Sequence, residues 1–252
     1  CIYYKGGKML EYKLINEETI MIYFEQQIDP STFKEVQKVE KYIKDQQHEA
    51  IIEIIPSYRA IMLHIDITKQ SLAKVVNELN LEQLNKLDFD ENLNEVKIIS
   101  LPVLYGGNYG PDIQEVATHN QLSIEEVIKL HTENTYLIYM LGFMPGFPFL
   151  GGLNSKLATP RREEPRTSIP AGSVGIANNQ TGLYPKQSPG GWQIIGRTPI
   201  TVFDILRTPM CLYESGDYIK FYSIDESTFE QIVEAQQGEF DIEKWVKIQY
   251  EY

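Results

Sequence analysis

Hydrophobic periodicity in the first hundred residues switches between the two-residue repeat of strands and the 3.6-residue repeat of helices. Residues 19–25 alternate in strand fashion. The segment that opens at Asp29 instead places its apolar residues on one helical stripe. Those residues are Phe33, Val36, Val39 and Ile43. We therefore predict a strand followed by a helix.

Two short apolar runs follow at 51–55 and 60–66, close enough to form a hairpin. A second helix is predicted from apolar residues spaced at i, i+3, i+4 and i+7, namely Leu72, Val75, Val76 and Leu79. An extended run from Val96 to Leu104 completes the order β-α-β-β-α-β. That order is typical of a ferredoxin-like α/β sandwich. We place this domain at residues 9–105.

A helical connection is predicted to follow the first domain. The glycine-rich stretch YGGNYGPD at 105–112 has the composition of a turn. Ser123 and Glu126 then have the spacing of a capping box, in which two side chains satisfy free backbone N–H groups at a helix start. We assign residues 106–134 to this connection.

The last part of the chain has a different character from Thr135 onward. Ten of the 17 glycines and eight of the 13 prolines lie between Gly142 and Pro199, which nearly excludes helix there. Short alternating runs separated by Gly and Pro turns predict a compact barrel or sandwich of strands over 135–252, with a terminal helix over 225–247. The predicted fold class is thus α+β, an α/β domain followed by an all-β domain.

Composition restricts the possible partners. The net charge of -12 and the isoelectric point near 4.9 argue against a nucleic-acid binder, which needs a basic face, and against an anionic membrane surface. The two cysteines, Cys1 and Cys211, form no disulfide framework or zinc motif, so we expect a reducing cytoplasm.

Residues 1–8 show no periodicity and precede Met9, which we interpret as a natural start; we therefore treat them as a leader outside the fold.

Arginine usage points to a candidate anion site. The chain has six arginines, yet Arg161, Arg162 and Arg166 fall within six residues, and Arg197 ends the same region. A guanidinium binds a carboxylate or phosphoryl group through two parallel hydrogen bonds, which an ammonium cannot do. The alternative is that these arginines pair internally with Glu163 and Glu164. Both interpretations stay open at this point.

Other motifs are weaker. The stretch GWQIIGRT at 191–198 matches the outline of a phosphate-binding loop, but Arg197 replaces the lysine and the strand-then-helix context is missing. His131 lies on the apolar face of a predicted helix, where it is either a core histidine or a general base. No serine-nucleophile elbow and no metal-ligand spacing occur, so no metal site is expected.

Four stretches together closely resemble the bacterial PxpB family, the B subunits of 5-oxoprolinase, also called allophanate hydrolase subunit 1. The family includes the Kip inhibitor of a sporulation histidine kinase. The four stretches are YGGNYGPD, LGFMPGFPFLGGL, LATPRREEPRTSIPAGSVGIA and QTGLYPKQSPGGWQIIGRTP. The resemblance is strong over about residues 100–215. It implies a C-terminal cyclophilin-like β-barrel preceded by a small α/β domain of ferredoxin-like type.

The resemblance also implies a function. Enzyme members of the family act with the A and C subunits of 5-oxoprolinase to open the lactam ring of 5-oxo-L-proline, giving L-glutamate at the expense of ATP. Which of the three binds ATP stays open. An activated lactam and the substrate carboxylate both call for preorganised hydrogen-bond donors. Arg162, Arg166 and His131 are considered as catalytic candidates, without an assignment. The candidates for binding substrate or an anion are Arg161, Arg162, Arg166, Gln180, Tyr184, Gly190, Gly191 and Arg197.

Two alternative functions share this fold. An inhibitor of a sensor histidine kinase would need an exposed apolar patch that docks on a helical dimer, whereas an enzyme subunit would need an anion-binding cleft. Subunit 1 of an allophanate hydrolase or a urea carboxylase-type carboxyltransferase is the other alternative, and it would require biotin delivered by another protein. The arginine cluster favours the oxoprolinase.

Overall fold

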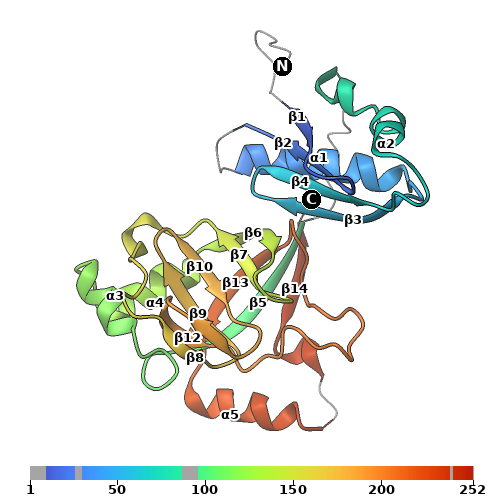
Figure 1. Ribbon diagram of the computed structural model, residues 1–252. Coiled ribbons are helices and arrows are strands. Elements are labelled where there is room, and N and C mark those ends of the chain that lie inside the picture. The colour runs from blue at the N-terminus through green and yellow to red at the C-terminus, as the bar shows by residue number, and fades with distance from the viewer. Residues whose placement is uncertain (1–9, 26–29, 87–95, 239–240, 252) are drawn as a thin grey trace. The chain divides into compact units, whose positions relative to one another are not determined.

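The computed structural model describes residues 10–25, 30–86, 96–238 and 241–251. The predicted leader at 1–8 therefore lies outside the described residues. The chain divides into two compact units, the first formed by the described residues up to 86 and the second by those from 96 onward. Figure 1 shows the strands and helices of both units.

The first unit is a four-stranded antiparallel sheet in the order β1-β2-β4-β3. Its strands are β1 (Glu11–Leu14), β2 (Thr19–Tyr23), β3 (Ile51–Ser57) and β4 (Ala60–Ile65). Its helices are α1 (Pro30–Asp45), α2 (Leu72–Glu78) and the 3-10 helix η1 (Leu81–Lys86).

Alternation along the strands builds the core of the first unit. One face of β2 and β4 is fully buried, through Ile20, Ile22, Ile61, Leu63 and Ile65. The predicted helical stripe of α1 is equally buried, and α1 packs against β3 and β4. Each buried aliphatic side chain contributes about 1.5–3 kcal/mol relative to an exposed one. The strand, helix and hairpin expected from the periodicity are therefore confirmed.

The fourth strand of this sheet is not the one that the sequence predicted. The run 96–104 is strand β5 (Val96–Tyr105), which pairs with strands of the second unit. The short strand β1 occupies the edge beside β2 instead. The first unit consequently ends before β5, and the predicted boundary at residue 105 is corrected.

The second unit is a closed β-barrel of seven strands. The sheet runs in the order β12-β9-β10-β7-β6-β13-β5, and β5 closes it by pairing with β12 through Tyr105 and Leu104. The other barrel strands are β6 (Thr135–Leu141), β7 (Pro148–Gly151), β9 (Ser173–Ala177), β10 (Gln180–Leu183), β12 (Gln193–Arg197) and β13 (Tyr218–Ser223). This confirms the expected fold class, an α/β unit followed by a barrel.

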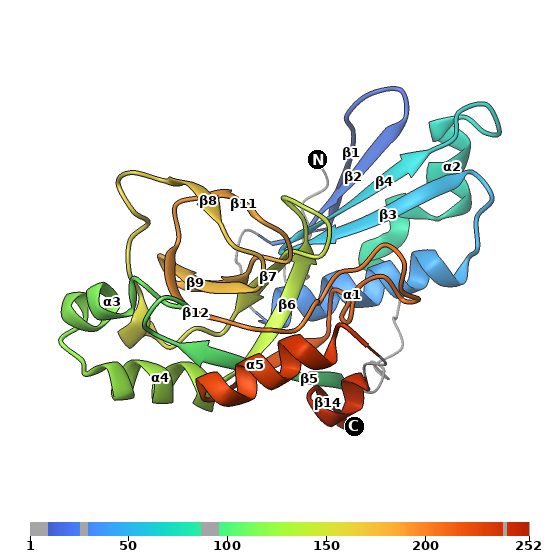
Figure 2. The same ribbon diagram turned by 90° about the horizontal axis from the view of Figure 1, so that it is seen from below.

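Further elements surround the barrel. Strand β14 (Lys247–Glu251) adds to β5, and β8 (Arg166–Ile169) pairs with β11 (Ser188–Gly190) in a separate ribbon. The helices are α3 (Ile113–His119), α4 (Ile124–Glu133) and α5 (Glu226–Ala235), with the 3-10 helices η2 (Ser155–Leu157) and η3 (Ile242–Lys244). Figure 2 shows the three α-helices outside the barrel strands.

The predicted connection at 106–134 is part of the second unit. Helix α3 packs against β12 and α4 against β13, so Val116, Ala117 and Val127 join the barrel core. The capping box of Ser123 and Glu126 is present in both directions. The predicted terminal helix is shorter than expected, since α5 ends at Ala235 and the last described residues form β14.

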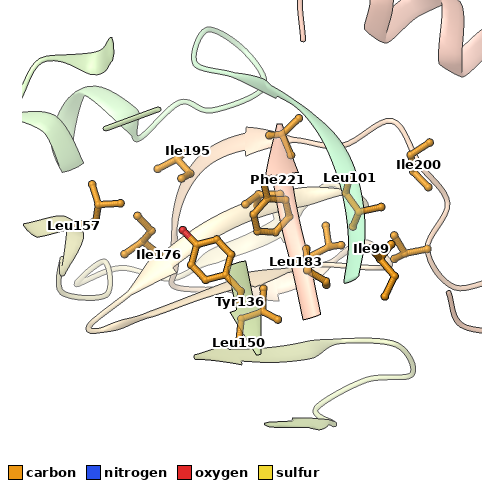
Figure 3. Close-up of a cluster of buried hydrophobic side chains, with 14 of the residues drawn as sticks. Ile99, Leu101, Tyr136, Leu150, Leu157, Ile176, Leu183, Ile195, Ile200 and Phe221 are labelled. Atoms are coloured by element: carbon orange, nitrogen blue, oxygen red, sulfur yellow. The ribbon is translucent and has the colours of Figure 1, made fainter. Parts of the chain in front are cut away.

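The barrel interior is filled by side chains rather than open. Figure 3 shows Leu101, Tyr136, Ile176 and Phe221 converging from four different strands. All four are fully buried. The core of the barrel is therefore made of packed hydrophobic side chains.

Candidate functional site

A buried carboxylate organises the arginine cluster. Asp112, at the N-terminus of α3, is 4% exposed. Arg166 donates to both carboxylate oxygens, from Nη1 to Oδ2 at 2.8 Å and from Nη2 to Oδ1 at 2.6 Å. Arg162 donates from Nη1 to Oδ1 at 3.0 Å, and the N–H of Ile194 donates to Oδ2 at 2.6 Å. We call Asp112, Arg162 and Arg166 the Asp112 cluster.

The Asp112 cluster carries one surplus positive charge, because two guanidinium groups face one carboxylate. The bidentate contact of Arg166 has the parallel geometry that only a guanidinium forms. Both arginine side chains keep partial contact with solvent, at 30% exposure for Arg162 and 27% for Arg166. The sequence left open whether the arginines pair internally with Glu163 and Glu164. The carboxylate that binds Arg162 and Arg166 in the structure is instead Asp112.

The same loop is held at two further points. The N–H of Arg162 donates to the carbonyl of Gly191 at 2.8 Å, and Nε2 of Gln193 donates to the carbonyl of Pro160 at 3.1 Å. Arg166 then begins β8 opposite Gly190. The arginine-bearing segment is therefore fixed to the glycine-rich strand region rather than free to move as a long loop.

Aromatic residues lie beside this loop. The Arg161 guanidinium sits 5.8 Å from the ring centre of Trp192, within the range of a cation–π contact. Tyr184 packs edge-on to Trp192, and burial raises the pKa of the Tyr184 phenol to about 12 although Arg161 opposes that rise. A Cβ on Gly190 would lie 2.5 Å from the Tyr184 hydroxyl oxygen, so only glycine allows this close approach.

The remaining anion-binding candidates lie in other strands. Arg197 ends β12 and donates from Nε to the carbonyl of Ala171 at 2.8 Å, while its side chain stays partly exposed. Gln180 begins β10 in the hairpin with β9, opposite Ala177. The structure thus brings Arg161, Arg162 and Arg166 together with the Gly190 region, and holds Arg197 through a separate backbone contact.

His131 lies fully buried within the barrel core. The Thr181 hydroxyl donates its proton to the Gly175 carbonyl at 3.0 Å, so Nε2 of His131 donates to Thr181 at 2.9 Å. Nδ1 then accepts from the Tyr105 hydroxyl at 2.8 Å. Both ring nitrogens of the neutral imidazole are satisfied, and burial lowers the pKa of His131 to about 3. This favours the interpretation as a core histidine.

The buried imidazole predicts a pH dependence of stability. The pKa of His131 is about 3 in the folded protein and near 6.5 when unfolded, so the unfolded state binds more protons between these values. The free energy of unfolding should therefore fall as pH drops below 6.5, by about 1.4 kcal/mol per pH unit from this residue. Urea titrations between pH 6.5 and 4.5 should show a shallower dependence in His131→Gln. Parallel curves for the two proteins would contradict this account.

Two features are absent from the part of the chain that the structure describes, a cluster of metal-ligating side chains and a helix able to span a membrane. No group of three or more His, Cys, Asp or Glu side chains there is placed to hold a metal ion. No helix among the same residues is long and apolar enough to cross a membrane.

Sequence reasoning missed Asp112 and Gln193. Asp112 is the last residue of YGGNYGPD and lies 50 and 54 positions before its two arginine partners. A lone aspartate at a turn resembles a helix cap, which hides its pairing role. The signal available in the sequence was Gly110, because a glycine can mark close packing of another backbone. In the structure a Cβ at Gly110 would lie 2.0 Å from the Ile195 carbonyl oxygen.

The sequence of the α/β unit and of the barrel that follows it matches a carboxyltransferase-type domain. Residues 10–213 match the family "Carboxyltransferase domain, subdomain C and D", and the chain belongs to this family. It is 41% identical over 229 residues to the 5-oxoprolinase B subunit of Bacillus subtilis (strain 168), a match that spans 85% of this chain and 93% of the relative.

Two further similarities agree with this family. The chain is 37% identical over 213 residues to the 5-oxoprolinase B subunit of Escherichia coli O157:H7, covering 82% of this chain and 93% of that protein. The crystal structure of the Kluyveromyces lactis urea carboxylase superposes with a TM-score of 0.76 at 20% identity. That match covers 96% of this chain but 24% of the other chain, and at this identity it shows the fold alone.

Proposed function

We propose that this chain is the B subunit of a multi-subunit, ATP-dependent 5-oxoprolinase, which opens the lactam ring of 5-oxo-L-proline to give L-glutamate. The observation that carries the proposal is the similarity to the 5-oxoprolinase B subunit of Bacillus subtilis, since it runs through 93% of that relative. Its partners in this function are the A and C subunits. The test is ATP-dependent glutamate release by the three purified chains, with each omitted in turn.

ATP is assigned to the complex rather than to this chain. The stretch 191–198 is the part of the sequence whose outline matched a phosphate-binding loop. In the structure its residues 193–197 form strand β12 inside the barrel sheet, and Nε of Arg197 donates to the Ala171 carbonyl. A phosphate-binding loop instead needs a loop that leads into a helix N-terminus. These residues therefore do not fit ATP.

The contribution that we propose for this chain is the binding of an anionic group. Ring opening of an activated lactam develops negative charge on oxygen, and the substrate carries a carboxylate. Arg161, Arg162 and Arg166 supply three guanidinium groups as hydrogen-bond donors on one loop, and the carboxylates of Glu163, Glu164 and Asp112 balance their charge. Because Arg162 and Arg166 are held by Asp112, Arg161 has the greater freedom to contact a ligand, and the two others position the loop.

Arg161→Ala is expected to lower kcat/KM of the assembled oxoprolinase by about 10- to 100-fold, with little change in thermal stability, because an exposed charge-assisted contact is lost. Steady-state kinetics of glutamate release measures this. Lys186→Ala is a matched control, since Lys186 is another exposed cation of the same unit. Equal kinetics in the two variants would remove Arg161 from the proposed site.

A second candidate function is inhibition of a sensor histidine kinase. An exposed apolar loop at residues 203–211 meets the requirement for a protein-docking patch that such an inhibitor has. Carboxyl transfer, as in an allophanate hydrolase or urea carboxylase, is supported by the family description and by the shared fold. The extent of similarity to the named oxoprolinase subunits places both behind the first proposal.

A further inference from the structure

A second hydrophobic cluster of the barrel unit is built around three aromatic rings, those of Phe147, Tyr184 and Trp192. The three rings meet edge to face, at interplanar angles of 81°, 87° and 85°. Each of the three side chains is 2–4% exposed. Edge-to-face contact is a favoured geometry for aromatic pairs, so each ring is held in one orientation by the other two. We call these three residues the aromatic cluster.

Two donors of the aromatic cluster lack an acceptor. The Tyr184 hydroxyl and the Trp192 indole N–H have no hydrogen-bond partner among the described residues. The fully buried Tyr213 differs, because its hydroxyl donates to the Gly146 carbonyl at 2.8 Å. Buried phenols and indoles usually have a partner, since an unpaired buried donor costs free energy. The contrast points to a ligand as the missing acceptor.

The backbone beside the Tyr184 hydroxyl is formed by glycine. A Cβ at Gly190 would lie 2.5 Å from the hydroxyl oxygen, so a side chain at this position would displace or cover the phenol. Gly191 follows at once, and both glycines are partly exposed. The two glycines therefore add no side-chain atoms beside the hydroxyl.

Arg161 supplies a positive charge at the same cluster. Its guanidinium lies 5.8 Å from the ring centre of Trp192. Arg162 and Arg166 bind Asp112, whereas Arg161 has no carboxylate partner in the described part of the chain.

The charge of Arg161 also acts on the Tyr184 phenol. Burial raises the pKa of this phenol to about 12, and Arg161 opposes the rise. The phenol therefore stays protonated at neutral pH and can donate a hydrogen bond. A neutral O–H donor and an unpaired guanidinium thus lie at one rigid cluster, an arrangement that suits an anionic acceptor.

The charge of the loop favours a carboxylate as that acceptor. The loop carries two exposed carboxylates, Glu163 and Glu164, next to Arg161 in the sequence. A phosphoryl group brings about two negative charges at neutral pH and would be repelled by them. A carboxylate brings one negative charge, which the single unpaired guanidinium of Arg161 balances.

We propose that the Tyr184 hydroxyl and the Arg161 guanidinium together bind the carboxylate of a small cyclic amide, so that this chain selects an acidic lactam over a neutral one. This rests on the proposed function, because 5-oxo-L-proline is the lactam that supplies the carboxylate. Tyr184 donates to one carboxylate oxygen and Arg161 to the other. Both residues bind the substrate at a group that ring opening leaves unchanged.

The test titrates the full chain with 5-oxo-L-proline and follows tryptophan fluorescence. Trp245→Phe serves as the parent for all variants, because it leaves Trp192 as the single tryptophan. The parent should bind saturably, and Tyr184→Phe should weaken binding by about 10- to 100-fold, the effect of losing a hydrogen bond to a charged group. Tyr250→Phe is the matched control, since Tyr250 is a 55% exposed phenol on β14, and it should bind like the parent.

Two further ligands identify the group that is recognised. 2-Pyrrolidone has the same lactam ring without the carboxylate, and it should not bind at concentrations that saturate the site with 5-oxoproline. Inorganic phosphate should not compete. Binding of 2-pyrrolidone as tight as that of 5-oxoproline, or competition by phosphate, would overturn the proposal, because the site would then recognise another group.

Stability separates a binding role from a structural one. Tyr184→Phe should keep the melting temperature of the parent, because the hydroxyl that it removes is unpaired. Tyr213→Phe should lower it, because it loses the bond to Gly146. A lowered melting temperature of Tyr184→Phe, equal affinities of Tyr184→Phe and the parent, or no saturable signal in the parent would each contradict the proposed site.

Kinetics of the assembled complex distinguish failure of the site from failure of the proposed function. Where the complex releases glutamate, Tyr184→Phe should raise KM for 5-oxoproline and leave kcat nearly unchanged, as expected for a contact made equally in the ground state and the transition state. An unchanged KM would remove the site while the function stands. Saturable binding that depends on Tyr184, in a complex that releases no glutamate, would support the site while the proposed function fails.

Discussion

Asp112→Ala is expected to lower the free energy of unfolding of the barrel unit by about 3 kcal/mol. Removal of this carboxylate leaves the two guanidinium groups of the Asp112 cluster beside each other without a counter-charge, and it leaves the N–H of Ile194 without its acceptor. Breaking a buried ion pair costs about 3–5 kcal/mol, and the lower end applies because both arginines touch solvent. Urea denaturation followed by tryptophan fluorescence measures the change, since Trp192 lies beside the arginine loop.

The matched control for that change is Glu164→Ala. Glu164 is an exposed carboxylate in the same loop, so its removal should change stability by no more than about 0.5 kcal/mol. If Asp112→Ala were as stable as Glu164→Ala, the Asp112 cluster would not hold the loop, and the surplus charge would lose its fixed position.

The periodicity of the first unit was sufficient to predict its elements because burial there follows simple alternation. The stripe of α1 and the inward face of β4 are buried as their spacing requires. Strand β1 was missed because EYKL is only four residues long and mostly polar. Strand β5 was found but placed in the wrong sheet, since an apolar run does not reveal which strands it pairs with.

The family resemblance predicted the barrel, but hydrophobic periodicity alone did not show which strands close it. Strand β13 pairs in parallel with β5, with Phe221 opposite Leu101, and no local pattern reports a contact across so much chain. The glycines and prolines predicted many short strands, which the structure confirms over 135–197. The helices of the predicted connection pack on the barrel because their apolar faces need a partner, and the closed sheet provides one.

The candidate site was predictable in part. Clustering of arginines in a chain that otherwise uses lysine indicated a place where bidentate geometry matters. The sequence could not show that the carboxylate bound by Arg162 and Arg166 is Asp112, because the contact exists only after YGGNYGPD folds against β12. The burial of His131 follows from the apolar helix face that carried it, whereas its tautomer depends on Thr181 in a distant strand.

Omission of this chain is expected to abolish glutamate release from 5-oxoproline by a mixture of the three oxoprolinase subunits. Under the proposed function this chain supplies the anion-binding loop, and its stretch 191–198 does not form a phosphate-binding loop because residues 193–197 are strand β12. On this proposal, ring opening coupled to ATP needs the assembled complex. We expect the rate without this chain to fall to that of ATP and 5-oxoproline alone, and restoration when the chain is added back.

The measurement that tests the central claim is this omission series, with assembly of the complex verified by analytical ultracentrifugation before each assay. Glutamate should appear only when the A and C subunits, this chain and ATP are all present. A verified complex that forms no glutamate, or a mixture that forms it equally well without this chain, would contradict the assignment as the 5-oxoprolinase B subunit.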